Sequence, residues 1–396
     1  ASSHRPQKRV PAPCPHACSG GVLLTGSLTA LFQGHGPLPL FIVQAICILL
    51  VSRTVGLLAR RVGQPMVIAE ILAGIMLGPS LLGWIAPGFY SALFPADSLR
   101  LLSLLAQFGL VLFMFFIGLE LDPKLLRGRG GASLLISQAG ILVPFAMGLG
   151  LAWLLYRPLS LPHVGFWPFA LFCGIAMSIT AFPVLARILS EWRLLRSKVG
   201  VLVITCAAIN DVVAWCILAF VVSVVNARGM HEAVVTTLYT GGYIAFMLVV
   251  MRPFLGRFAA RGANREGLTQ NMVAGTFVLL LMSAWATDVI GIHALFGAFM
   301  LGTIVPKENG FATALADKLE DFVIVFLLPI FFAYSGLRTD IGSLNSATAW
   351  MQCGLIILVA CVGKIGGSAI AARIAGQTWR EAFSVGALMN TRGLME

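Results

Sequence analysis

Charged and polar side chains occur inside long apolar stretches of this sequence. Asp211 and Lys364 are the clearest cases, because each lies many residues from the nearest charged connection. A charge at bilayer depth is costly unless it is paired or hydrated, so such residues are candidates for function. Burial disfavours a charged carboxylate and a nearby ammonium group favours it. If these two effects balance near neutral pH, the carboxylate could hold either a proton or a dehydrated monovalent cation, but not both.

Four polar residues fall at similar depths. With a rise of 1.5 Å per residue, four different helices place a polar group on the order of 14 to 20 Å from the expected cytoplasmic edge: Asp211, Lys364, Thr180 and Asn390. Residues that served only local packing would have no reason to agree in depth. We therefore expect an ion site near the middle of the membrane.

Two of these four helices are predicted to be broken. Pro183 follows the polar run at 178–180, and a proline removes an N–H group and clashes with the preceding turn. The run at 390–393, which includes Arg392 and a glycine, interrupts the last helix in the same way. Breaks at corresponding positions of two oppositely oriented halves are typical of transporters built from inverted repeats.

Three further charges lie nearer the ends of their apolar blocks. Glu70 and Arg187 are close to the expected cytoplasmic ends of their helices, and Arg53 is long enough to reach water. We expect a structural or interface role for these three. Glu120 and Glu70 are both expected near an aqueous boundary, so their replacement should cause only partial loss of function.

The composition excludes soluble classes of protein. Of 396 residues, 58% are hydrophobic and 11% are charged, whereas a soluble domain has about 45–50% apolar and about 25% charged residues. The hydrophobic blocks are close to the ~20 residues needed to cross a bilayer as a helix. The sequence therefore predicts an all-α polytopic membrane protein, and long unbroken apolar runs such as 199–225 exclude a transmembrane barrel.

About 12 spans are expected after a Pro/Gly/Ser-rich tail at residues 1–37. Their approximate ranges are 38–59, 64–83, 99–118, 131–156, 166–190, 199–225, 233–254, 270–287, 291–304, 320–335, 346–372 and a last one that opens near 381. Lys and Arg are concentrated in every second connection, which orients those connections toward the cytoplasm.

The placement of Lys and Arg in every second connection also explains the net charge of +11, so no nucleic-acid partner is expected. Cys14, His16 and Cys18 resemble part of a metal site but lack a second ligand pair. No cofactor is expected, and no metal beyond a transported monovalent cation. His293 follows a glycine at a short turn and is expected to serve packing rather than proton relay.

Several motifs resemble the monovalent cation:proton antiporter-2 family, which includes Kef-type bacterial transporters and plant cation/proton exchangers. In chain order they are 63–80 (GQPMVIAEILAGIMLGPS), 116–122 (FIGLELD), 180–185 (TAFPVL), 210–211 (ND), 291–299 (GIHALFGAF) and 390–394 (NTRGL). The resemblance extends from about residue 38 to the end of the chain. It implies a sodium/proton-antiporter fold with inverted repeats and two crossed discontinuous helices.

The resemblance also implies a homodimer and two domains. Residues 38–118 and 233–335 would form the scaffold and dimerisation domain, and residues 131–225 and 346–396 a mobile ion-transport core. Asp211 would be the exchanging carboxylate with Asn210 beside it, Thr180 and Asn390 would line the site, and Lys364 would be its basic partner. Electrogenic relatives have Asp-Asp where this sequence has Asn210-Asp211.

The expected function is antiport of K⁺ or Na⁺ against H⁺ by alternating access, with electroneutral stoichiometry. A sodium-coupled organic-solute symporter of the same architecture is the alternative, and a channel or transporter-like sensor is a further one. An enzyme is not expected, because the chain has one central aspartate and no H-E-x-x-H motif. The sequence does not distinguish K⁺ from Na⁺.

The last helix begins on the cytoplasmic side and reaches its break shortly before residue 396. An inverted repeat needs a partner for the span that carries Asp211, so a thirteenth span is expected in the complete protein. A cytoplasmic regulatory domain beyond residue 396 is possible in this arrangement. Residues 1–396 alone are expected to leave Arg392 without protein around it and to be unstable and inactive. The expected location is a bacterial inner membrane.

Overall fold

The computed structural model describes residues 37–121, 130–160, 164–195, 197–225, 231–263, 269–307 and 310–392. Every regular element within these ranges is helical. The tail with Cys14, His16 and Cys18, as well as Asp122 and residues 393–396, lie outside the described residues.

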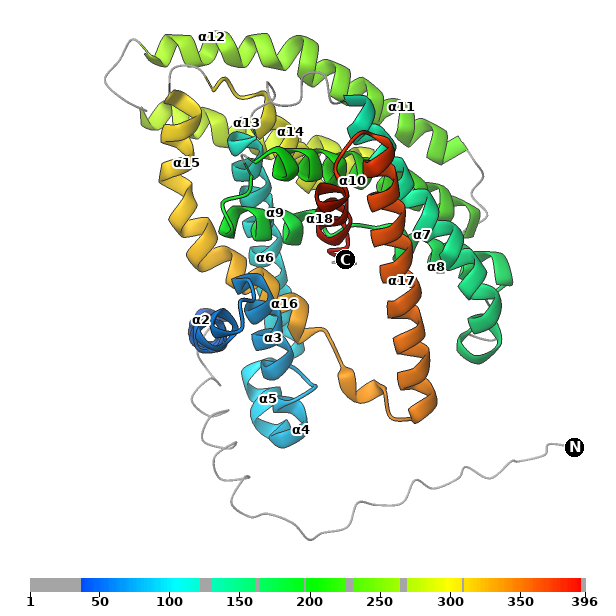
Figure 1. Ribbon diagram of the computed structural model, residues 1–396. Coiled ribbons are helices and arrows are strands. Elements are labelled where there is room, and N and C mark those ends of the chain that lie inside the picture. The colour runs from blue at the N-terminus through cyan, green and yellow to red at the C-terminus, as the bar shows by residue number, and fades with distance from the viewer. Residues whose placement is uncertain are drawn as a thin grey trace, which may run out of the picture.

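The helices follow one another along the chain as Figure 1 shows. They are α2 (Pro37–Arg61), α3 (Met66–Leu77), α4 (Leu82–Ile85), α5 (Pro87–Leu93), α6 (Ala96–Glu120), α7 (Gly130–Leu159), α8 (Phe166–Ser178), α9 (Phe182–Glu191), α10 (Lys198–Val225), α11 (His231–Phe246), α12 (Arg252–Ala263), α13 (Gln270–Ile290), α14 (Ala294–Ile304), α15 (Phe311–Phe322), α16 (Leu328–Leu337), α17 (Ala347–Ile374) and α18 (Trp379–Met389). Wider helical turns at Met247–Met251 and Val323–Leu327 connect α11 to α12 and α15 to α16.

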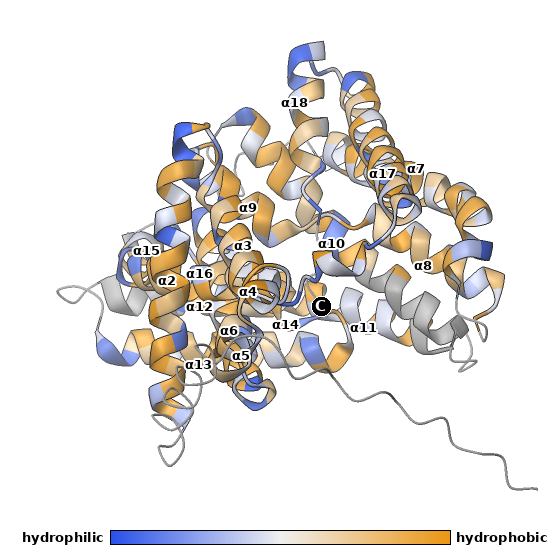
Figure 2. Cartoon of the chain, turned by 90° about the horizontal axis from the view of Figure 1, so that it is seen from below, coloured by the Kyte–Doolittle hydropathy of each residue, from blue (hydrophilic) through white to orange (hydrophobic). Residues whose placement is uncertain are grey.

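Nine helical segments among the described residues are long and apolar enough to cross a bilayer. They are Pro37–Arg61, Met66–Ile85, Ala96–Glu120, Gly130–Leu159, Phe166–Glu191, Val234–Arg257, Gln270–Ile290, Phe311–Ser343 and Ala347–Ile374. In Figure 2 the helices are mainly hydrophobic along their lengths, with hydrophilic colour concentrated near their ends. This is the pattern that a lipid-facing surface requires.

The predicted spans coincide with helices, but the total number of crossings stays a prediction. The 28-residue α10 matches the predicted span 199–225, and α14 and α18 match the ninth and twelfth. These last two helices have 11 residues each. A helix of that length is roughly half as long as a full crossing requires.

The described helices pack as two groups. In one, α7, α8, α10, α17 and α18 contact one another, and in the other α2, α3, α6, α14 and α16 do so. The half-helix α9 contacts α10 from the first group and α3 and α6 from the second, and Figure 1 places it near the middle of the molecule. The division into a core and a scaffold domain stays a prediction.

Close helix approach in the second group depends on glycine. A Cβ atom on Gly336 of α16 would lie 2.2 Å from the carbonyl oxygen of Ile71 on α3, and one on Gly74 would lie 2.0 Å from the oxygen of Ala333. Neither position leaves room for a side chain. Small residues at such crossings let backbones approach, which is how helices associate when lipid removes the hydrophobic driving force.

Candidate functional site

The predicted break in the fifth span is present. α8 ends at Ser178 and α9 begins at Phe182, so residues 179–181 form a short non-helical connection. Pro183 lies in the first turn of α9, where its missing N–H would have no partner within the helix anyway. The proline therefore defines the start of the second half-helix, and the chain opens just before it.

The end of α18, where the second break is predicted, lies beside the first break. α18 ends at Met389, and the backbone N–H of Ala181 donates to the carbonyl oxygen of Thr391 at 2.9 Å. A main-chain hydrogen bond thus joins the two non-helical segments, although about half of the chain separates them in sequence. This is the arrangement expected of two crossed discontinuous helices, and it brings helix ends and free backbone groups to one place.

α10 contacts the first break through Asn210. Its Nδ2 donates to Thr180 Oγ1 at 2.9 Å, and both residues are buried. Asn210 Oδ1 accepts no hydrogen bond from the residues that the structure describes. Asp211 follows on the same helix and is half-buried. Asp211 is therefore less enclosed than Asn210.

Lys364 reaches the end of α8. It is fully buried on α17, and its Nζ donates to the carbonyl oxygen of Ser178, the last residue of that half-helix. The C-terminal end of a helix carries partial negative charge, so an ammonium group there is favourable. Lys364 therefore binds the backbone carbonyl at the end of α8, and Asn210 binds the side chain of Thr180 in the connection that follows.

Arg392 connects the second break to the surrounding helices. Its guanidinium donates to the carbonyl oxygens of Met177 on α8 and Ala360 on α17, and its Nε donates to Asn390 Oδ1 at 3.1 Å. The expectation that Arg392 would have no protein around it in residues 1–396 is wrong. Its arm is long enough to reach carbonyls of two neighbouring helices, one near the end of α8 and one in the middle of α17.

Asn390 has a second partner as well. Its Nδ2 donates to the sulfur of Cys361 on α17 at 3.4 Å. All four polar residues that were predicted to lie at similar depth are thus found at or beside the two breaks. Thr180, Asn390 and Lys364 are part of a break or contact one directly, and Asp211 follows Asn210 on α10.

Other predicted residues lie away from the breaks. Glu70 was expected near an aqueous boundary, but it is fully buried on α3, with Arg187 of α9 at 3.8 Å. Glu70 does lie near the start of α3, but α9 packs on α3 and covers the carboxylate, so its position near a helix end does not bring it into contact with water. Glu120 ends α6 and is half-buried. His293 has a φ of 72° and accepts a hydrogen bond from the Leu295 N–H at the start of α14, as a capping residue does.

The backbone acceptors were not predictable from residue types. The carbonyls of Met177, Ser178 and Ala360 bind the ammonium group of Lys364 and the guanidinium group of Arg392, yet none of these three residues has a side chain that indicates such a role. For Met177 and Ser178 the signal was the proline after the break, because it predicts a helix end and therefore free carbonyls before it. Ala360 lies in the middle of α17, and no local pattern indicates its role.

Comparison with known proteins identifies the family. Residues 46–396 match the family described as "Sodium/hydrogen exchanger, transmembrane". The chain is 43% identical over 358 residues to the Na(+)/H(+) antiporter NhaS4 of Synechocystis, covering 90% of this chain and 87% of that protein. It therefore belongs to the transmembrane sodium/hydrogen exchanger family and is an integral multi-pass membrane protein.

Two eukaryotic relatives are longer. Cation/H(+) antiporter 17 of Arabidopsis thaliana is 41% identical, with 96% of this chain and 46% of that protein covered. K(+)/H(+) antiporter 1 of Saccharomyces cerevisiae is 33% identical, with 95% and 44% covered. The chain thus spans about half the length of these two relatives. All three relatives are named antiporters, and none of these names supports the symporter alternative.

The fold also matches a solved structure. The sodium proton antiporter MjNhaP1 from Methanocaldococcus jannaschii aligns with a TM-score of 0.59, 93% coverage of this chain and 85% of that one, at 13% sequence identity. The similarity shows that this chain has the sodium/proton-antiporter fold.

Proposed function

We propose that this protein exchanges a monovalent cation, Na⁺ or K⁺, for H⁺, and that Asp211 is the carboxylate that carries one or the other. The observation that carries the proposal is the contact between Asn210 and Thr180, because it fixes the helix bearing Asp211 to the break between α8 and α9. Relatives named Na⁺/H⁺ and K⁺/H⁺ antiporters support the exchanged ions.

The groups around Asp211 fit this chemistry. A dehydrated monovalent cation is stabilised by neutral oxygens together with one carboxylate, and Thr180, Asn210 and Asn390 supply side-chain oxygens at the breaks. Lys364 and Arg392 meanwhile direct their charge to helix-end carbonyls. One carboxylate that alternates between H⁺ and a cation gives one-for-one, electroneutral exchange.

The transport cycle in this proposal is alternating access. Residues 131–225 and 346–396 would form the core that carries the ion, and residues 38–118 and 233–335 the scaffold, which would also form a homodimer. The packing of the described helices as two groups, with α9 between them, supports this division. Rigid-body movement of one group against the other would expose the site to each side in turn.

The test uses the full-length protein in proteoliposomes that contain a pH-sensitive dye. A pH gradient is imposed, and Na⁺, K⁺ or Li⁺ is then added outside. Saturable, cation-dependent dissipation of the gradient is the expected result. A change that depends on an organic solute, or a flux that does not saturate, would contradict antiport.

A further inference from the structure

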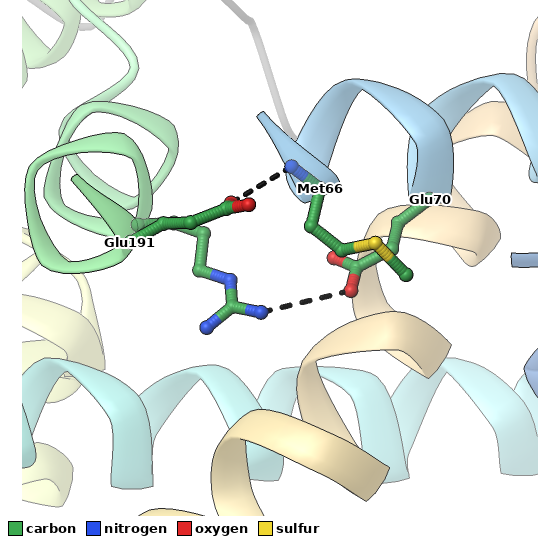
Figure 3. A network of polar contacts seen from close by, with 4 residues as sticks. Met66, Glu70 and Glu191 are labelled. Atoms are coloured by element: carbon green, nitrogen blue, oxygen red, sulfur yellow. Dashed lines mark hydrogen bonds and ion pairs between the residues drawn. The ribbon is translucent and has the colours of Figure 1, made fainter. Parts of the chain in front are cut away.

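A buried charge pair links α3 to α9. Arg187 Nη2 lies 3.8 Å from Glu70 Oε1, and the side chains of the two residues are 8% and 1% exposed, respectively. Figure 3 shows this contact beside a second one, in which the backbone N–H of Met66 donates to Glu191 Oε2 at 2.7 Å. Both contacts join the first turns of α3 to the last two turns of α9.

The pair is incompletely satisfied. Within the described part of the chain, both carboxylate oxygens of Glu70 lack a hydrogen-bond partner. The Nε of Arg187 also lacks one. At 3.8 Å the two charges attract each other without a direct hydrogen bond, since such bonds between charged groups are about 2.7–2.9 Å long. A small shift of α9 along α3 could therefore either close the contact or open it.

The charge pair lies where the two groups of helices meet. α9 begins at the break that holds Thr180 and packs on α10, the helix of Asp211. α3 packs on α2 and α16 in the other group of helices. An apolar contact also joins α9 to the second group of helices: the rings of Phe182 and of Phe299 on α14 meet edge to face, with their centres 4.9 Å apart.

Charge and apolar contacts respond differently to sliding. Apolar surfaces exchange one set of neighbours for another at little cost, whereas separating a buried charge pair leaves two uncompensated charges. The energy of the α3–α9 contact therefore depends steeply on the relative position of the two helices. A contact with that dependence can favour one of two discrete arrangements.

We infer that Glu70 and Arg187 form a latch that holds α9 against α3 in one state of the transport cycle and sets how readily the protein leaves that state. The inference rests on the proposed function, because the moving group is the one that carries Asp211. In this role Glu70 and Arg187 are positioning residues, and they do not contact the ion.

The first experiment measures the latch without transport. The thiol introduced by Ser190→Cys, on α9 three residues after Arg187, is labelled with a maleimide in detergent-solubilised full-length protein whose native cysteines have been replaced. Glu70→Gln and Arg187→Gln should each raise the labelling rate about fivefold or more, the lower range of known coupling effects. The charge exchange Glu70→Arg with Arg187→Glu should restore the original rate within about twofold, because it re-forms the pair.

A matched control lies at the same interface. Glu191→Gln keeps an oxygen that can accept the Met66 N–H but removes a charge of the same sign as that of Glu70. This variant should label like the parent protein. An effect of Glu191→Gln as large as that of Glu70→Gln would show that any charge change loosens α9 and would overturn the latch.

The second experiment measures exchange in proteoliposomes. The two single variants should lower turnover about fivefold or more while the half-saturating cation concentration changes less than about twofold, because the ion ligands are untouched. The charge exchange should recover most of the turnover. Unchanged labelling in Glu70→Gln, or a folded charge-exchange variant that recovers neither labelling nor turnover, would overturn the inference.

The two proposals can fail separately. If the parent protein exchanges no cation for H⁺, the proposed function is wrong, and the labelling rates still decide whether the pair holds α9. If Glu70→Gln does not fold, Glu70→Asp replaces it, since this change keeps the charge but shortens the arm. It should then raise the labelling rate, and a parental rate would count against the latch.

Discussion

Asn210 on α10 donates a hydrogen bond to Thr180, which lies in the non-helical connection between α8 and α9; the Nδ2 to Oγ1 distance is 2.9 Å. Both residues are almost completely buried. The continuous helix that carries Asp211 is therefore attached to the broken one at the break itself. Any movement of the break changes the surroundings of the carboxylate.

The first prediction concerns this hydrogen bond. Thr180→Val keeps the shape of the side chain but removes the acceptor, which leaves the buried amide of Asn210 without its partner. Such a loss costs about 1–3 kcal/mol, or roughly five- to 150-fold in an equilibrium constant. We expect the half-saturating cation concentration in proteoliposomes to rise by that factor. Thr180→Ser retains the hydroxyl and should behave nearly as the parent; equal effects of the two variants would contradict this role.

The second prediction concerns Asp211. Asp211→Asn removes the charge with almost no change of volume, so the protein should remain folded while cation-dependent H⁺ movement disappears. Folding is checked by a monodisperse elution profile and an unchanged melting temperature in detergent. Glu70→Gln is a useful comparison, because it should only slow exchange. Substantial exchange by well-folded Asp211→Asn would show that another group carries the ion.

The sequence predicted the position of groups along each helix better than their neighbours across helices. Counting residues from the charged connections placed Thr180, Lys364 and Asn390 at similar depth, and the structure brings all three to the two breaks. Pro183 predicted the first break because the restriction that a proline imposes is local.

Contacts between distant segments were less predictable. Glu70 is close to the end of its helix, which suggested contact with water, but the packing of α9 against α3 encloses it. Arg392 was expected to lack surrounding protein, yet carbonyls of α8 and α17 bind it. In both cases the deciding partner is on a helix far away in sequence, and hydropathy and charge patterns contain no information about such pairs.

The third prediction concerns stability. Gly336→Ala places a Cβ atom 2.2 Å from the Ile71 carbonyl oxygen, so α16 must move away from α3. Overpacking of this kind costs about 1–3 kcal/mol or more, and the melting temperature in detergent should fall accordingly. Gly366→Ala on α17 is the matched control, because a Cβ atom there meets nothing within 4 Å. It should leave the melting temperature unchanged or raise it slightly. A similar fall in both variants would indicate that helix contact is not the cause.

The last prediction concerns stoichiometry. With one exchanging carboxylate at Asp211 and a neutral Asn210 beside it, one H⁺ should move for each cation, and no net charge crosses the membrane. A potential of 100 mV acts on one transferred charge with about 2.3 kcal/mol, which corresponds to roughly 50-fold in a rate or equilibrium constant. Exchange by the parent protein should therefore change less than about twofold when such a potential is imposed on the proteoliposomes.

A pH gradient imposed on the same liposomes is the positive control and should change the rate strongly. Lys364 is the group that could alter this result, because loss of its proton during cation binding would move a second H⁺. The ammonium group of Lys364 donates a hydrogen bond to the Ser178 carbonyl at the end of α8, where the partial negative charge of the helix end favours a positive charge. This contact favours a cycle in which Lys364 keeps its proton. Asn210→Asp adds a second carboxylate at the break and should make exchange sensitive to the potential. A parent protein that already responds several-fold to the potential would show that more than one proton moves per cation.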